Sequence, residues 1–189
     1  MKNSEKLTMM EIVVIAVIAV VMGIISLGID AVYMPLATAL GPYGSAVIYG
    51  IYFVSSIIPM YIVRKPGASL LGSLFTGIMN ILLGSPYGIH IVVAQLCQGL
   101  GIELGCAMFK YKRFDFVPLA IGSVIGMLLK TTRDYFVFGF GELGSMMPII
   151  TIIRCLSAAI IGGFVTILLG KALLKTGVLK EFKIAKDQL

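Results

Sequence analysis

The 189-residue sequence has little charge, no tryptophan and a single histidine. Asp, Glu, Lys and Arg make up 13% of it, against roughly 25% in an ordinary soluble domain. Apolar residues make up 59%, and the mean hydropathy is +1.03. These values exclude a soluble enzyme, a disordered chain and a disulfide-stapled scaffold. They predict an all-α membrane protein that forms one domain over residues 1–189.

Motifs for catalysis and metal binding are also lacking. The sequence contains no GxxxxGK[ST] loop for ATP, no HExxH and no CxxC pair. A single histidine cannot supply a pair of imidazole ligands, and the three cysteines lie inside apolar runs, where small buried side chains are expected. No GxSxG surrounds Ser85, so an intramembrane serine hydrolase is not favoured. We therefore expect neither an enzyme nor a bound metal or other cofactor.

Long apolar runs dominate the sequence, and Pro, Gly and basic residues divide them. A helix needs about 20 residues to cross the hydrocarbon core of a bilayer. The divisions predict a bundle of six transmembrane helices over about residues 9–29, 43–63, 67–83, 87–109, 116–138 and 146–174. The stretch 30–42, which contains Pro and Gly, is expected to be a loop. The first run is too long for the apolar core of a signal peptide, so we expect a retained span.

The basic residues are distributed asymmetrically about these spans. With the N-terminus inside, twelve of the 15 Lys and Arg residues fall in the N-terminal segment, at 64–65, at 110–113 and between 171 and 186. This asymmetry follows the positive-inside rule and predicts that both termini face the cytoplasm. The net charge of +6 is therefore a topology signal, and we expect no nucleic-acid partner. The other three basic residues, Lys130, Arg133 and Arg154, lie in or near the last two spans.

Polar side chains gather at one depth of the predicted bundle. An ionisable group inside a span is costly, so it usually lines a site or pairs with a partner. A rise of about 1.5 Å per residue places polar residues of four spans in one outer layer, and two tyrosines of the second span reach it. The residues are Tyr49, Tyr52, Asn80, His90, Gln95, Lys130, Asp134 and Arg154. The layer predicts a pocket, open to the outside, that binds a small polar molecule.

The alternative is that these groups only satisfy one another. Lys130 and Asp134 stand four residues apart and can pair on one helix face. Arg154 can bind helix-end carbonyl groups or Glu142. Glu103 lies deeper, near the cytoplasmic end, where we expect a structural ion pair or a contact with a partner.

Small residues four apart form a second pattern. Ala19 and Gly23 have this spacing on the first span, and glycines have it at 101 and 105 and at 122 and 126. Such spacing lets helices approach closely. Because the first span has an otherwise smooth, uncharged surface, we expect Ala19 and Gly23 to dock another subunit, with packing inside the chain as the alternative.

Several stretches, spread in order over nearly the whole chain, resemble the signature stretches of one transporter family. They are GP at 41–42, YGIYF at 49–53, RKPGA at 64–68, LLGSP at 82–86, QGLGIE at 98–103, IR at 153–154, GKA at 170–172 and TGVL at 176–179. In sequence and spacing the chain resembles the YkoE-type S components, which are the substrate-binding subunits of energy-coupling-factor (ECF) vitamin transporters.

The resemblance implies a six-helix, multi-pass S component of the bacterial plasma membrane, surrounded by lipid. It would bind thiamine or its hydroxymethylpyrimidine precursor from the outside for ATP-driven uptake. Its partners would be a transmembrane coupling subunit and two ATPase domains, and the stretch 30–42 would act as an outer lid. A stand-alone small-molecule transporter or channel is the alternative function. A membrane enzyme or an assembly factor would need a reactive pair that the sequence does not show.

The resemblance is incomplete at positions that concern the substrate. Asp134 matches an acidic position of the family, whereas Ser73 and Asn80 stand where members usually carry Glu. Lys130 and Arg133 add positive charge to the same region. Because like charges repel strongly in a low-dielectric pocket, a neutral pyrimidine or an anionic compound fits better than cationic thiamine, unless Asp134 neutralises Lys130.

Overall fold

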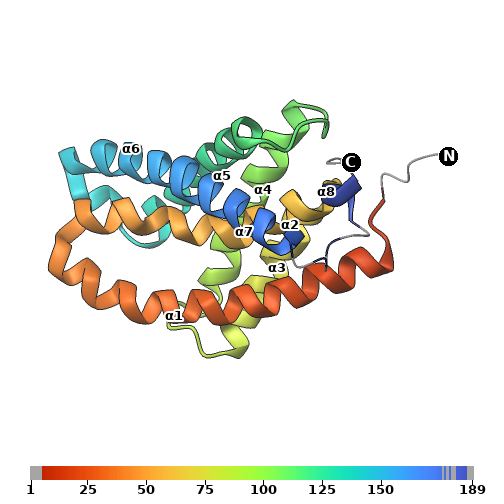
Figure 1. The fold of residues 1–189 in the computed structure, drawn as a ribbon. Coiled ribbons are helices and arrows are strands. Elements are labelled where there is room, and N and C mark those ends of the chain that lie inside the picture. Colours follow the sequence, from red (N-terminus) through yellow and green to blue (C-terminus); the bar gives the residue numbers. More distant parts are fainter. Residues whose placement is uncertain (1–5, 176, 178, 180–181, 187–189) are drawn as a thin grey trace.

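The computed structural model describes residues 6–175, 177, 179 and 182–186, and every regular element among them is a helix. This agrees with the all-α class that the sequence predicts. Two of the basic residues that orient the predicted spans, Lys2 and Lys180, lie outside the described residues. Figure 1 shows the helices gathered side by side into one bundle.

Helix α1 (Met9–Ile48) is the longest helix described, and it begins at a capping box. The Thr8 N–H donates to Glu11 Oε2 at 2.8 Å, and the Glu11 N–H donates to Thr8 Oγ1 at 3.4 Å. These bonds satisfy two donors that a bare helix end leaves unpaired. The helix continues without a break through Asp30, so the loop predicted over 30–42 is wrong, and any outer lid in this stretch would be helical.

A single glycine replaces that loop. Gly41 has a φ of 68°, which suits a residue without a Cβ, and it interrupts the helical geometry of α1. Pro42 follows in the first turn of the returning arm, where its missing N–H is not needed. Figure 1 shows the two arms of α1 meeting at this bend, at the end of the bundle opposite to Met9.

The returning arm leads through the short 3-10 helix η1 (Tyr49–Phe53) into α2 (Val54–Val63). Every residue of α2 is buried, so this helix forms the centre of the apolar core. It ends at Arg64, which adopts a left-handed conformation with a φ of 56°, and its N–H bonds to the Met60 carbonyl at 2.9 Å. The chain then turns into α3 (Ala68–Leu82).

Helices α4 (His90–Met108) and α5 (Phe116–Val137) approach each other through their glycines. A Cβ on Gly101 would lie 2.2 Å from the Gly126 Cα, and one on Gly105 would lie 2.5 Å from the Gly122 Cα. Side chains at these positions would force the backbones apart. The glycine spacing of these two helices therefore serves packing inside the chain.

The last long segment passes through η2 (Phe140–Met146), α6 (Met147–Ser157), the π-helical turn η3 (Ala158–Gly162) and α7 (Gly163–Lys175). Ser157 fixes it against the returning arm of α1, because its hydroxyl donates to the Val47 carbonyl and accepts the Gly50 N–H at 2.8 Å. A short helix, α8 (Lys183–Lys186), follows near the start of α1, as Figure 1 shows.

The small residues of α1 face the interior. Ala19 is fully buried, and a Cβ on Gly23 would lie 2.8 Å from Met79 Cβ of α3. This corrects the expectation that the pair docks another subunit, because a face packed on α3 cannot also touch a partner. The outward face of α1 carries larger apolar residues, among them Val17, which is 59% exposed, and Ile24, which is 57% exposed.

Apolar surface of this kind surrounds the bundle. The segments Met9–Val63, His90–Met108, Phe116–Val137 and Phe140–Lys175 are long and apolar enough to cross a membrane, and α3 is a shorter apolar helix. The first of these is folded back on itself at Gly41, so it contributes two antiparallel arms. An outward-facing apolar coat of this extent is the surface that lipid requires.

Candidate functional site

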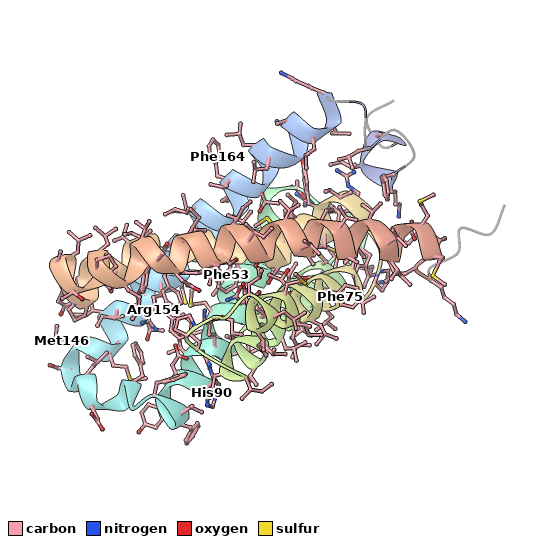
Figure 2. The ribbon with its side chains drawn as sticks, turned by 90° about the horizontal axis from the view of Figure 1, so that it is seen from below. Phe53, Phe75, His90, Met146, Arg154 and Phe164 are labelled. Carbon is pink, nitrogen blue, oxygen red and sulfur yellow. The ribbon has the colours of Figure 1, made fainter. Side chains whose placement is uncertain are left out.

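A cavity of about 250 Å³ lies between α1, η1, α4, α5, η2 and α6. Its walls are lined by Asp30, Tyr33, Tyr49, Tyr52, Tyr87, His90, Ile91, Ala94, Gln95, Gln98, Lys130, Arg133, Asp134, Phe138, Phe140 and Arg154. In Figure 2 the labelled His90 and Arg154 lie toward the end of the molecule that carries Met146, away from the start of α1. The cavity therefore occupies one end of the bundle.

Seven of the eight residues predicted to bind substrate line this cavity. They are Tyr49, Tyr52, His90, Gln95, Lys130, Asp134 and Arg154. The eighth, Asn80, is fully buried outside the lining, and neither of its side-chain polar atoms has a hydrogen-bond partner among the described residues. His90 is exposed, and its ring meets the Phe138 ring edge-on with centroids 5.4 Å apart, so it stands at the rim.

Arginines surround one carboxylate of the cavity. Arg133 Nη2 lies 2.6 Å from Asp134 Oδ1, and Arg154 Nη1 lies 3.4 Å from Asp134 Oδ2. Arg133 also donates to the His90 carbonyl at 3.1 Å, which ties α5 to the start of α4. The alternative interpretation of the sequence allows Lys130 to pair with Asp134 and Arg154 to pair with Glu142; among the described residues, Asp134 instead pairs with Arg133 and Arg154.

Lys130 lies among aromatic rings. It is 5% exposed, and its Nζ lies 4.4 Å from the ring centroid of Tyr49 and 5.7 Å from that of Tyr52. The Gln98 amide is satisfied when its oxygen accepts from Lys130 Nζ at 3.0 Å and its nitrogen donates to the Tyr52 carbonyl at 3.1 Å. Ring faces and an amide oxygen thus surround the Lys130 nitrogen, and the described residues place no carboxylate within ion-pair distance of it.

Three tyrosines form an aromatic wall of the cavity, and both Lys130 and Arg154 lie 4.4 Å from the ring centroid of one of them, Tyr49. The ring centroids of Tyr33, Tyr49 and Tyr52 lie 5.7 to 6.0 Å from one another, at the separations of edge-to-face and tilted pairs. The Tyr52 hydroxyl donates to Asp30 Oδ1 at 2.7 Å, and Asp30 is only 4% exposed. This wall joins flat aromatic surface to a second carboxylate.

Sequence reasoning missed several residues of the cavity. Those with polar or aromatic side chains are Asp30, Tyr33, Tyr87, Gln98, Phe138 and Phe140. Asp30 and Tyr33 fall in the stretch read as a loop, and a helix continued through it would have placed both near Tyr52. Arg133, which also lines the cavity, is absent from the eight candidates, although the sequence places its charge in the region of the ligand.

Glu103 belongs to the other end of the bundle. Its Oε1 accepts the Ser69 N–H at 2.9 Å and the Leu70 N–H at 3.4 Å, at the start of α3. Its Oε2 accepts from the Tyr111 hydroxyl at 2.9 Å, and burial together with this carboxylate raises the pKa of Tyr111. The predicted ion pair is thus replaced by a carboxylate that caps a helix N-terminus, as its dipole favours.

The sequence and the structure were compared with known proteins. Residues 10–129 match the family described as "ABC-type cobalt transport system, permease component". Over 178 residues, 94% of this chain and 89% of the relative, the sequence is 30% identical to YkoE of Bacillus subtilis (strain 168), named as an HMP/thiamine permease protein. A crystal structure of an S component of an ECF transporter has a TM-score of 0.92 and 29% identity, covering 97% of this chain and 93% of that chain.

Apolar helices around a polar cavity, with this similarity over nearly the whole chain, define an integral membrane protein of the ECF transporter S-component class. Within that class, the chain belongs to the YkoE-type family. The family resemblance seen in the sequence is confirmed, and so is the location in a membrane. The family consists of transport proteins and not of enzymes.

Proposed function

We propose that the chain is the substrate-binding subunit of an ECF-type ABC importer. It captures thiamine, its hydroxymethylpyrimidine (HMP) precursor or a related vitamin-like molecule from the outside. The observation that carries the proposal is the tyrosine wall with the Asp30 carboxylate, in a chain similar to a protein named as an HMP/thiamine permease.

The aminopyrimidine ring, which HMP and thiamine share, is the part of the substrate that suits this cavity. It is flat, so it can stack on or meet the edges of the rings of Tyr33, Tyr49 and Tyr52. Its amino group can donate to Asp30, which is a charge-assisted hydrogen bond. Its ring nitrogens accept hydrogen bonds, which the basic side chains and the two glutamines of the cavity can donate.

Asp30 also changes the electrostatic balance of the proposed site. Considered alone, the sequence disfavours a cation, because neutral residues stand at Ser73 and Asn80 and basic ones at Lys130 and Arg133. The cavity nevertheless holds two carboxylates beside its three basic residues, and Asp30 is bound by a phenol rather than by a cation. The site is thus compatible with thiamine as well as with neutral HMP. Three basic side chains disfavour a free divalent cation, although the matched family description names cobalt.

The membrane topology of this proposal has six crossings and cytoplasmic termini. The crossings are the two arms of the Met9–Val63 segment, α3, α4, α5 and the α6–α7 segment, and they form a single domain. The basic loops at Arg64–Lys65 and 110–113 lie at the end opposite to the cavity, which supports an outward-facing cavity by the positive-inside rule. A coupling subunit and two ATPase domains would supply the energy, and their docking surface is not formed by the buried Ala19 and Gly23.

Binding to the purified chain tests the proposal. The chain in detergent is expected to bind HMP and thiamine saturably without ATP, and mass spectrometry is expected to find one of them bound after purification. Tyr49→Leu should abolish binding, because it removes the ring beneath Lys130, whereas Tyr135→Leu, at a 47% exposed tyrosine outside the cavity, should leave it intact. Absence of binding by the wild type would refute the proposed substrates.

The alternative function is a stand-alone transporter or channel. Liposomes that contain only this chain should then show flux of the ligand, whereas the proposed subunit needs the coupling and ATPase subunits together with ATP. Uptake by the chain alone would contradict the proposal and support the alternative.

A further inference from the structure

A cluster of buried serines lies directly behind the cavity. Ser55 and Ser56 of α2 and Ser69 and Ser73 of α3 are at most 1% exposed. Ser73 Oγ lies 2.9 Å from Ser56 Oγ, and Ser69 Oγ donates to the Ser56 carbonyl at 2.6 Å. None of the four lines the cavity, but two of them reach a side chain that does.

That side chain is Gln95. Ser56 Oγ lies 3.3 Å from Gln95 Oε1, and Ser55 Oγ lies 3.2 Å from the same atom. A hydroxyl carries one proton, and the Ser55 proton has a nearer acceptor in the Tyr52 carbonyl, which lies 2.9 Å from Ser55 Oγ. Ser56 is therefore the serine that donates to the Gln95 oxygen. Gln95 is 1% exposed and lines the cavity, so an amide held by its oxygen turns its NH₂ group away from the serines.

Lys130 fixes the direction of this network. As an ammonium it only donates, so the Gln98 oxygen faces it and the Gln98 nitrogen faces the Tyr52 carbonyl. The Gln98 oxygen then no longer competes for the Ser56 proton. With Ser73 donating to Ser56, the Ser56 proton is left for Gln95 Oε1. The Gln98 orientation thus removes one acceptor from Ser56, the Ser73 hydroxyl occupies another position around Ser56 Oγ, and Gln95 Oε1 remains as the acceptor.

We propose that Ser56, supported by Ser73, is a positioning residue that holds the Gln95 amide with its NH₂ group toward the ligand. The ligand must then present an acceptor, such as the unprotonated ring nitrogen beside the amino group of HMP. In the analogue with an oxo group in place of the amino group, that ring nitrogen carries a proton. Its N–H would then face the NH₂ group of Gln95, and no hydrogen bond could form. The cavity therefore selects aminopyrimidines over oxopyrimidines, an inference that rests on the proposed function for its ligand class.

The first test needs no ligand. The chain has three glutamines, at 95, 98 and 188, so labelling the glutamine side-chain amides gives three NMR signal pairs. Ser56→Ala is expected to shift or broaden the Gln95 pair, because the amide can then turn over. Ser123→Ala is the matched control, since Ser123 is equally buried but donates to the Leu119 carbonyl within α5. An unchanged Gln95 pair in Ser56→Ala would overturn the proposal.

The second test measures selectivity with HMP and its oxo analogue. The wild type and Ser123→Ala are expected to prefer HMP equally, and Ser56→Ala is expected to lose about tenfold of that preference, the worth of one hydrogen bond. A general loss of fold lowers both affinities and leaves their ratio unchanged. A retained ratio in Ser56→Ala, or an equal loss in Ser123→Ala, refutes the role of Ser56. If the wild type binds neither compound, the proposed function fails, and the NMR result alone decides the proposal.

Discussion

The two carboxylates of the cavity lie on different helices and are held in different ways. Asp134, on α5, lies against the guanidinium groups of Arg133 and Arg154. Asp30, on α1, accepts a hydrogen bond from the neutral Tyr52 phenol. A carboxylate between two arginines has its charge balanced inside the protein, whereas one bound by a phenol still attracts a donor or a cation. We infer that the Asp134 wall is the scaffold and that the Asp30 wall binds the ligand.

The largest effect is expected from Asp134→Asn. The substitution keeps the side-chain volume but leaves Arg133 and Arg154 without a counter-charge at membrane depth. Removing one partner of a buried ion pair costs about 3–5 kcal/mol, so the melting temperature in detergent should fall by several degrees and ligand binding should be lost. The measurement is thermal unfolding followed by circular dichroism.

Asp115→Asn is the matched control for this prediction. Asp115 also pairs with an arginine, Arg113 Nη2 at 2.6 Å, but both side chains are at least half exposed, at 50% and 55%. The hydrogen bond from Arg113 lowers the pKa of Asp115, so the carboxylate is charged at neutral pH in the protein too. An exposed pair contributes little, and its loss should leave the melting temperature nearly unchanged. Equal destabilisation by the two substitutions would show that Asp134 is not a special scaffold group.

A smaller and more selective effect is expected from Asp30→Asn. The Asn oxygen can still accept from Tyr52, so the fold should survive while the negative charge is lost. Affinity for cationic thiamine should fall about tenfold to a hundredfold, as for a hydrogen bond to a charged group, and affinity for neutral HMP should fall less. Titration calorimetry with both ligands measures the difference. Equal losses for the two ligands would place the thiamine charge away from Asp30.

The sequence predicts most of this fold because apolar length and charge asymmetry act over whole helices. The helices α3, α4 and α5 begin and end within three residues of the predicted bounds 67–83, 87–109 and 116–138. The stretch 30–42 was misjudged because Pro and Gly there allow either a loop or a single sharp bend, and only the packing of the two arms decides between them. Depth along a helix follows from counting residues, which is why seven of the eight candidates share one cavity.

The rotation of each helix about its axis and the partners of its side chains depend on the neighbouring helices. Neither follows from counting residues along the sequence. Asp134 has Lys130 one turn away, yet it takes its partners from the adjacent residue and from another helix. Ala19 and Gly23 have the spacing of any close helix contact, and nothing in the spacing distinguishes α3 from a separate subunit. Contacts between distant segments therefore had to come from the structure.

The smallest effect is expected at Asn80, a polar residue on neither wall. It is fully buried, and its amide lacks a hydrogen-bond partner among the described residues, so the desolvated amide weakens the fold. Asn80→Leu has similar volume and should raise the free energy of unfolding by about 1 kcal/mol while leaving the affinity for HMP unchanged. Gln95→Leu makes the same polar-to-apolar change in the cavity lining and should weaken binding. Reduced affinity in a stable Asn80→Leu variant would show that Asn80 reaches the ligand, and the walls of the site would then extend to α3.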